Sequence, residues 1–151
     1  MNKNEKNTAL SIHLSSLAQY VFPLAGIIVP IIIWSSKKDD SEFVYKHGKS
    51  CINFQLSIFL YSFILALIFI SILIFMAIKK MSLSSSGFDS ENFSFNDLST
   101  DNLLTFGLIG GIAFLIFLLI KIAEFVLIII ASVKASNGEM YKYPFTISFL
   151  K

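Results

Sequence analysis

Arginine is absent from this sequence of 151 residues, and cysteine and tryptophan occur once each. All 12 cationic side chains are lysines, which lack the two-pronged guanidinium group that reads phosphates and bases. Because the net charge is also only +2, we set nucleic acid aside as a partner. The lone Cys51 excludes an intrachain disulfide, and we expect a reduced thiol with a structural role.

Catalytic and metal-binding patterns are also missing. His13 and His47 are the only histidines, and neither lies in a cluster of Cys, His and carboxylate residues with metal-ligand spacing. No glycine-rich phosphate loop or nucleophile elbow can be recognised. We therefore expect no metal, no cofactor and no enzymatic activity, and we interpret His13 as a hydrogen-bonded interface residue.

Apolar residues, in contrast, make up 55% of the chain, against 15% charged residues. They form three segments at about 10–34, 52–78 and 103–133, each longer than the ~20 residues that cross a bilayer as a helix. The sequence predicts one membrane domain over residues 1–151, an all-α polytopic bundle with three membrane segments. The serine-rich loop 79–102 joins the second and third segments and is expected to be flexible.

The first segment is expected to be kinked or broken, because Pro23 and Pro30 each remove a backbone donor. A re-entrant first segment is the alternative to a crossing. The third segment is expected to end at Asn137-Gly138, a typical C-terminal stop.

Lysine placement predicts the topology. With three crossings, residues 35–50 and the C-terminus lie on one side, together with seven lysines, against four on the other side. The positive-inside rule makes that side cytoplasmic. A re-entrant first segment would bring the N-terminus inside and leave the rest unchanged.

Two charges interrupt the third segment. Lys121 and Glu124 are three residues apart, so they share a helix face and can pair. Charges within a membrane span are costly and often functional. Three readings stay open: the charges mark the membrane interface, they form a buried structural pair, or they line an ion or proton path.

The polar stretches 35–50 and 134–151 are expected to form a short cytoplasmic cap. Asn53 and Gln55 can bond free helix ends, Gly138 and Pro144 can turn the tail, and tyrosines suit the membrane interface. The cap either closes the bundle or docks a partner. The candidate interaction face comprises Lys37, Lys38, Asp39, Asp40, His47, Asn53, Gln55, Asn137, Gly138, Tyr141, Tyr143 and Pro144.

Four motifs follow one another along the chain: His13, the turn Trp34-Ser-Ser-Lys37-Lys38-Asp39, the stretch His47 to Gln55, and a signature from Ala131 to Pro144. In this order the sequence resembles the 4870 domain-of-unknown-function family of bacterial membrane proteins, related to the Tic-twenty component of chloroplast protein import. The resemblance implies a bacterial host and an architecture more than a mechanism.

We therefore expect a non-enzymatic, multi-pass protein of the cell membrane that acts as a scaffold or interaction subunit, by analogy in membrane protein assembly or transport. Its expected partners are the lipid bilayer and a membrane protein or a second copy. An immunity or stress protein that shields a membrane target from a peptide toxin is the alternative. A small solute or ion conduit is the third reading.

Overall fold

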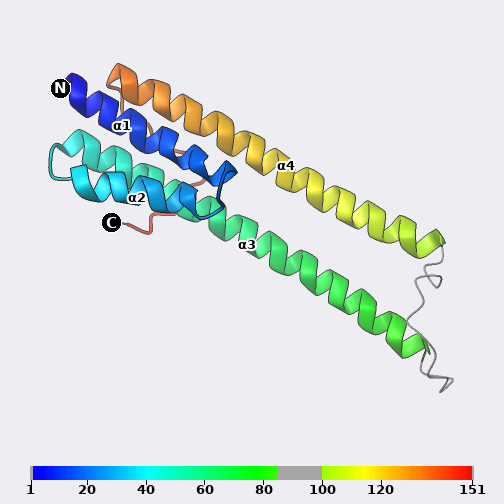
Figure 1. Cartoon of the computed structure of the whole chain (residues 1–151). Coiled ribbons are helices and arrows are strands. Elements are labelled where there is room, and N and C mark those ends of the chain that lie inside the picture. Colours follow the sequence, from blue (N-terminus) through cyan, green and yellow to red (C-terminus); the bar gives the residue numbers. More distant parts are fainter. Residues whose placement is uncertain (1, 85–99, 151) are drawn as a thin grey trace. The chain divides into compact units, whose positions relative to one another are not determined.

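The computed structural model describes residues 2–84 and 100–150 (Figure 1). This part of the chain contains helices and no strand, which confirms the all-α class. Residues 139–150, called the C-terminal segment below, follow the last helix without helix or strand. The elements are α1 (Lys3–Ser15), the 3-10 helix η1 (Ser16–Tyr20), α2 (Ala25–Lys37), α3 (Glu42–Ser84) and α4 (Thr100–Asn137).

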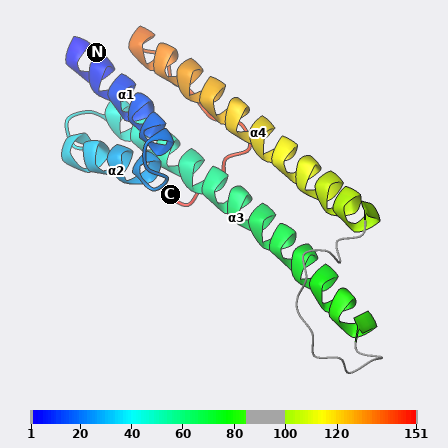
Figure 2. The same cartoon turned by 45° about the vertical axis from the view of Figure 1, so that its right-hand side comes forward.

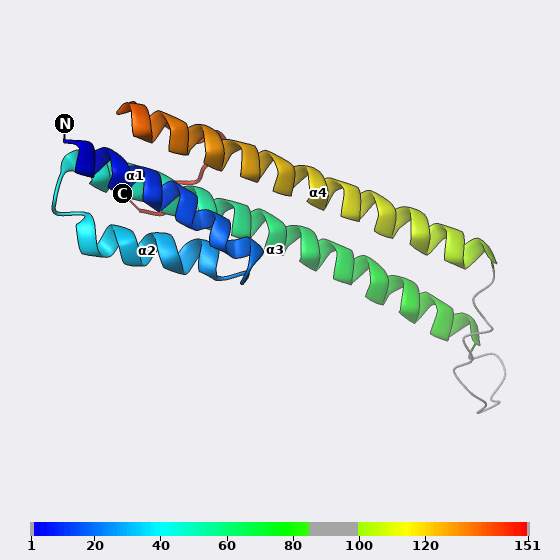
Figure 3. The ribbon, with the colours of Figure 1, turned by 45° about the horizontal axis from the view of Figure 1, so that its top comes forward.

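The first apolar segment folds as a hairpin. The expected break lies between η1 and α2 and contains Pro23, whereas Pro30 lies inside α2. α1 and α2 run side by side in opposite directions (Figures 1 and 3). Each has 13 residues, or ~20 Å of helix, which is less than the ~30 Å of a bilayer's hydrocarbon core. Residues 10–34 are therefore not one membrane-spanning helix.

Gly26 allows the two arms of the hairpin to approach closely. A Cβ atom at this position would lie 2.7 Å from Gln19 Cβ and 3.0 Å from the Ser16 carbonyl oxygen. Both distances are shorter than ordinary van der Waals contact, so a larger residue would push η1 and α2 apart.

The second apolar helix starts earlier than the sequence predicts. We expected the segment to open at residue 52 after a polar stretch, but α3 begins at Glu42. The Ser41 hydroxyl accepts a hydrogen bond from the Val44 amide at 3.2 Å, which satisfies one of the free N–H groups of the first turn. Residues 42–50 are thus helix rather than part of a loop.

The end of α4 is where the sequence places it. Gly138 adopts φ 86°, and the amides of Gly138 and Glu139 bond back to the carbonyls of Ala135 and Lys134 at 3.0 and 2.9 Å. This pair of bonds is the Schellman motif, in which a glycine takes the left-handed conformation. The predicted stop at Asn137-Gly138 is confirmed.

The chain divides into two compact units. The first, called the polar unit, comprises Met1–Tyr61 and Lys121–Lys151, and the second, called the apolar unit, comprises Ser62–Ile120. In the apolar unit, the described parts of α3 and α4 expose large apolar side chains such as Phe63, Ile74, Phe114 and Leu119.

The polar unit has two small apolar cores. Ile12, Val44 and Cys51 join α1 to α3, while Phe54, Ile128, Ala131 and Tyr143 join α3, α4 and the C-terminal segment. Cys51 is a buried free thiol beside the Ser16 hydroxyl, at 3.2 Å. Two helical stretches, Glu42–Phe75 and Gly107–Asn137, are long and apolar enough to cross a membrane.

Candidate functional site

A chain of hydrogen bonds between buried side chains joins α1, α3 and the C-terminal segment. His13 Nε2 lies 2.8 Å from His47 Nδ1, and the Tyr143 hydroxyl lies 2.9 Å from His13 Nδ1. All three side chains are buried. Buried polar groups are tolerated when they have such partners; His47 Nε2 is buried and has no hydrogen-bond partner among the described residues. The three residues therefore tie two helices to a chain end that is 130 positions away from His13.

The geometry fits two neutral imidazoles. A contact between two ring nitrogens needs one N–H and one lone pair, and a neutral imidazole carries one of each. When Tyr143 donates to His13 Nδ1, the proton of His13 sits on Nε2 and is donated to His47 Nδ1. Burial lowers the pKa of His13 to about 3, and the charge on His47 is the second cause. Burial also raises the pKa of Tyr143 well above its ordinary value, so its hydroxyl keeps its proton.

The ring of Tyr143 also anchors the C-terminal segment by packing. It stacks on Phe54 with the centroids 4.0 Å apart and the ring planes at 10°. Ile128 and Ala131 of α4 belong to the same buried cluster. Tyr143 thus combines a large apolar contact with a hydrogen bond, the use to which buried tyrosines are suited.

Four polar side chains of α3 hold the main chain of the C-terminal segment. These residues are Ser50, Asn53, Ser57 and Tyr61, and together they are called the main-chain stripe. Their spacing of three, four and four residues places them on one face of the helix. Ser50 Oγ donates to the Tyr141 carbonyl at 3.2 Å, and Tyr61 OH donates to the Phe145 carbonyl at 2.8 Å. Ser57 Oγ accepts from the Ile147 amide at 2.8 Å. Asn53 Nδ2 donates to the Leu150 carbonyl at 3.2 Å, and Asn53 Oδ1 accepts from the Leu150 amide at 2.8 Å.

The order of these bonds shows that the C-terminal segment reverses direction. It meets the stripe first at Ser50, continues to Tyr61 and returns to Asn53. The turn lies at Pro144 and Phe145, and Phe145 adopts φ 54°. Figure 2 shows the segment leaving α4 and reaching the first half of α3. Pro144 therefore occurs at a turn, as the sequence predicts.

Trp34 of the turn motif packs closely against Gly48 of the His47 to Gln55 stretch. A Cβ atom on Gly48 would overlap the indole ring of Trp34, because it would lie 1.9 Å from Cδ1. The indole Nε1 donates to the Tyr45 carbonyl at 3.2 Å, and Lys38 Nζ lies 5.8 Å from the ring centroid. The end of α2 is thus seated on the start of α3, next to His47.

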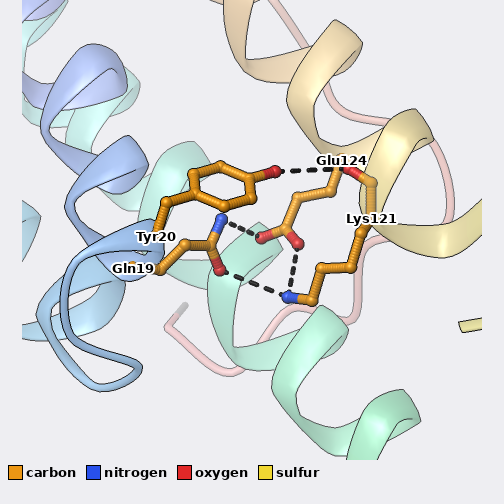
Figure 4. A network of polar contacts seen from close by, with 4 residues as sticks. All are labelled: Gln19, Tyr20, Lys121 and Glu124. Atoms are coloured by element: carbon orange, nitrogen blue, oxygen red, sulfur yellow. Dashed lines mark hydrogen bonds and ion pairs between the residues drawn. The ribbon is translucent and has the colours of Figure 1, made fainter. Parts of the chain in front are cut away.

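A second polar network surrounds the charges of α4 (Figure 4). Lys121 Nζ pairs with Glu124 Oε2 at 2.8 Å, and Gln19 Nε2 donates to Glu124 Oε1 at 2.8 Å. The Tyr20 hydroxyl donates to the Lys121 carbonyl at 3.4 Å. The side chain of Glu124 is 0% exposed and that of Lys121 is 26% exposed. Both carboxylate oxygens have partners, an arrangement typical of a structural pair that fixes η1 to α4.

The predicted interaction face separates into two groups. His47, Asn53, Tyr141 and Tyr143 come together around the C-terminal segment. The second group is a charged rim at the α2–α3 turn, where Lys37 pairs with Asp40 at 3.3 Å; the rim comprises Lys37, Lys38, Asp39 and Asp40.

Gln55 and Asn137 belong to neither group. Gln55 is buried, and its Nε2 has no hydrogen-bond partner within the described residues, so it does not bond a helix end there. Asn137 offers its carbonyl to Lys6 Nζ at 3.3 Å and precedes Gly138 at the end of α4. Neither residue contributes a side-chain bond to the C-terminal segment in that part of the chain.

Sequence reasoning did not single out four participants: Gln19, Ser50, Ser57 and Tyr61. His13 was expected to be hydrogen-bonded, and the structure identifies its partners as His47 and Tyr143. Ser57 and Tyr61 carry a usable signal, because they continue the helical spacing of Ser50 and Asn53 within an apolar run. The contact between Gln19 and Glu124 joins residues 105 positions apart, so no local sequence pattern predicts it.

Comparison with known proteins corrects the expected resemblance. Neither curated proteins nor solved structures give a match. Residues 4–150 match a different family from the 4870 and Tic-twenty group, so that assignment is wrong. The matching family carries the description magnetosome magnetite crystal formation protein family, and the match covers nearly the whole chain. The chain therefore belongs to the MamF/MmsF family.

Proposed function

We propose that this protein is a non-enzymatic scaffold of the magnetosome membrane that takes part in magnetite crystal formation. The observation that carries the proposal is the family match over residues 4–150. The two apolar helical stretches support a membrane location. The structural pairing of Glu124 with Gln19 and Lys121 favours a scaffold over a conduit, because the carboxylate is already fully engaged.

We propose two crossings rather than three. α3 has 43 residues, or ~65 Å of helix, so about half of it extends beyond a hydrocarbon core of ~30 Å. The parts of α3 and α4 in the apolar unit, residues 62–84 and 100–120, are each ~30–35 Å long and match that thickness. The polar unit then lies at the membrane surface, where the apolar break of the hairpin, including Val21 and Phe22, can enter the interface.

The lysines support this topology. With the α1–α2 hairpin on the same side as the C-terminal segment, Lys3 and Lys6 join the seven lysines of that side. Lys121 also belongs to the polar unit, so the asymmetry becomes ten lysines against Lys79 and Lys80. By the positive-inside rule the polar unit, including residues 35–50 and the C-terminus, is cytoplasmic.

The charged rim offers the surface for a partner of the scaffold. Lys37, Asp39 and Asp40 are exposed, whereas Lys38 is half-buried over the Trp34 ring. The rim carries two charges of each sign, and Lys37 pairs with Asp40 within the rim itself. We propose that a membrane protein or a second copy of this chain docks there, while the lipid bilayer surrounds the apolar unit. Such rim contacts set specificity more than affinity.

A complementation experiment tests this function. The gene is deleted in a magnetosome-forming host and restored as the parent or with all four rim residues (Lys37, Lys38, Asp39 and Asp40) changed to alanine. We expect deletion to alter crystal size or number in electron micrographs, the parent to restore both, and the rim variant to fail at equal membrane abundance. Lys79→Ala with Lys80→Ala is the matched control. Normal crystals in the deletion strain would refute the proposal.

A further inference from the structure

The bonded pair of histidines is sensitive to protons by its geometry. One added proton would place a cation among buried groups, which is costly without a counter-charge. A second proton would leave His13 Nε2–H and His47 Nδ1–H facing each other at the present 2.8 Å. The observed contact is therefore compatible with the neutral pair and incompatible with the doubly charged one.

The groups around the pair do not offer a free counter-charge. The C-terminal segment presents the neutral phenols of Tyr141 and Tyr143. It also places Glu139 next to His47, and the Glu139 carboxylate pairs with Lys134 at 3.6 Å. α3 presents the ring of Phe43 to His47 and the Cys51 thiol to Tyr143. Glu124 of α4 is the nearby carboxylate that acts on Tyr143, and it is paired with Lys121 and bonded by Gln19. α2 packs against the neighbouring cluster of Ile12, Val44 and Cys51 through Ile33 and Trp34, which do not titrate.

We propose that His13 and His47 form an acid-sensitive latch that holds the C-terminal segment on α3 when neutral and releases it when protonated. Tyr143 transmits the change, because its hydroxyl bonds to His13 and its ring stacks on Phe54. Release would uncover the main-chain stripe, whose side chains now bond the segment at Tyr141, Phe145, Ile147 and Leu150.

The direction of the pH effect follows from linkage. The pKa of His13 is lowered by burial from 6.5 to about 3 in the closed state. The released state, with an ordinary pKa, therefore binds more protons between these values. The closed state, with the C-terminal segment bound to α3, has its full stability above pH 6.5. This stability decreases as the pH falls from 6.5 toward 3. The ratio of closed to released protein falls by up to about tenfold per pH unit for one histidine, and up to about 100-fold when both take up a proton.

Spin-label mobility on the full chain measures this ratio. The label is attached at Phe149→Cys in a Cys51→Ser background, with the protein in nanodiscs. Phe149 is exposed in the segment, so the label does not disturb the core. We expect an immobilised spectrum at pH 7.5 and a mobile component that grows on acidification to pH 4.5, reversibly. An unchanged spectrum over this range would overturn the proposal.

Two variants separate the latch from other acid effects. His13→Gln with His47→Gln keeps polar side chains that do not titrate, so the mobile fraction should become independent of pH. A retained pH response in this variant would overturn the proposal, because carboxylates would then be responsible. Tyr143→Phe keeps the stacked ring and removes the hydroxyl; it should raise the mobile fraction already at pH 7.5. An unchanged mobile fraction there would contradict the role of the hydroxyl as the link.

Discussion

The side-chain amide of Asn53 forms two hydrogen bonds with the main chain of Leu150, donating to its carbonyl at 3.2 Å and accepting from its amide at 2.8 Å. The two residues are 97 positions apart. A side chain on a helix thus acts as the partner that an extended chain would otherwise find in a neighbouring strand.

Asn53→Ala should loosen the end of the chain. The change removes both bonds to Leu150, and we expect the free energy of unfolding to fall by about 1–3 kcal/mol. Denaturant titration in detergent micelles measures this value, and protease sensitivity of residues 139–151 reports the local effect. Asn7→Ala, at an exposed position of α1, is the matched control. Equal stability of the two variants would show that the amide does not hold the segment.

Gly48→Ala should disturb the packing of the Trp34 indole ring against α3. The added methyl group would lie 1.9 Å from Trp34 Cδ1, so the indole must move, at a cost of about 1–3 kcal/mol. In a Trp34→Ala background the same change should be nearly neutral, which a double-mutant cycle on thermal stability detects. Gly110→Ala is the control, because nothing lies within 4 Å of a Cβ atom there. Additive effects of Trp34→Ala and Gly48→Ala would refute the contact.

Glu124→Gln should strand the charge of Lys121. We expect a loss of about 2–4 kcal/mol in detergent, because one partner of a mostly buried pair remains charged. Changing both residues to methionine should restore much of the stability, since no unpaired charge is left. If single substitutions at Lys121 and Glu124 leave stability unchanged, the two charges instead mark the membrane interface.

Sequence patterns predicted the helices better than their contacts. Hydropathy located α3 and α4, and Gly138 marked the end of α4 through a local conformational requirement. The early start of α3 was missed because residues 42–50 are polar, although Ser41 is a recognisable cap. Length alone suggested that residues 10–34 cross the bilayer, and the break at Pro23 divides them into arms that are individually too short.

The candidate site was predictable only in part. Asn53, His47 and Tyr143 all belong to the predicted interaction face; His47 and Tyr143 each bond to His13, and Asn53 bonds to Leu150. Their partners could not be read from one sequence, because the pairing of His13 with His47 and Tyr143 depends on how α1 packs on α3. Periodicity identifies a face, whereas the fold decides what that face contacts.

The central claim, that the first apolar segment is a hairpin on the side of the C-terminus and not a third crossing, can be tested directly by cysteine labelling. Single cysteines replace Asn4 and Asp39, both exposed, in a Cys51→Ser background, and a membrane-impermeant maleimide is applied to inside-out and right-side-out vesicles. The account predicts that both positions react from the cytoplasmic face alone. Labelling of position 4 from the face opposite to position 39 would contradict it.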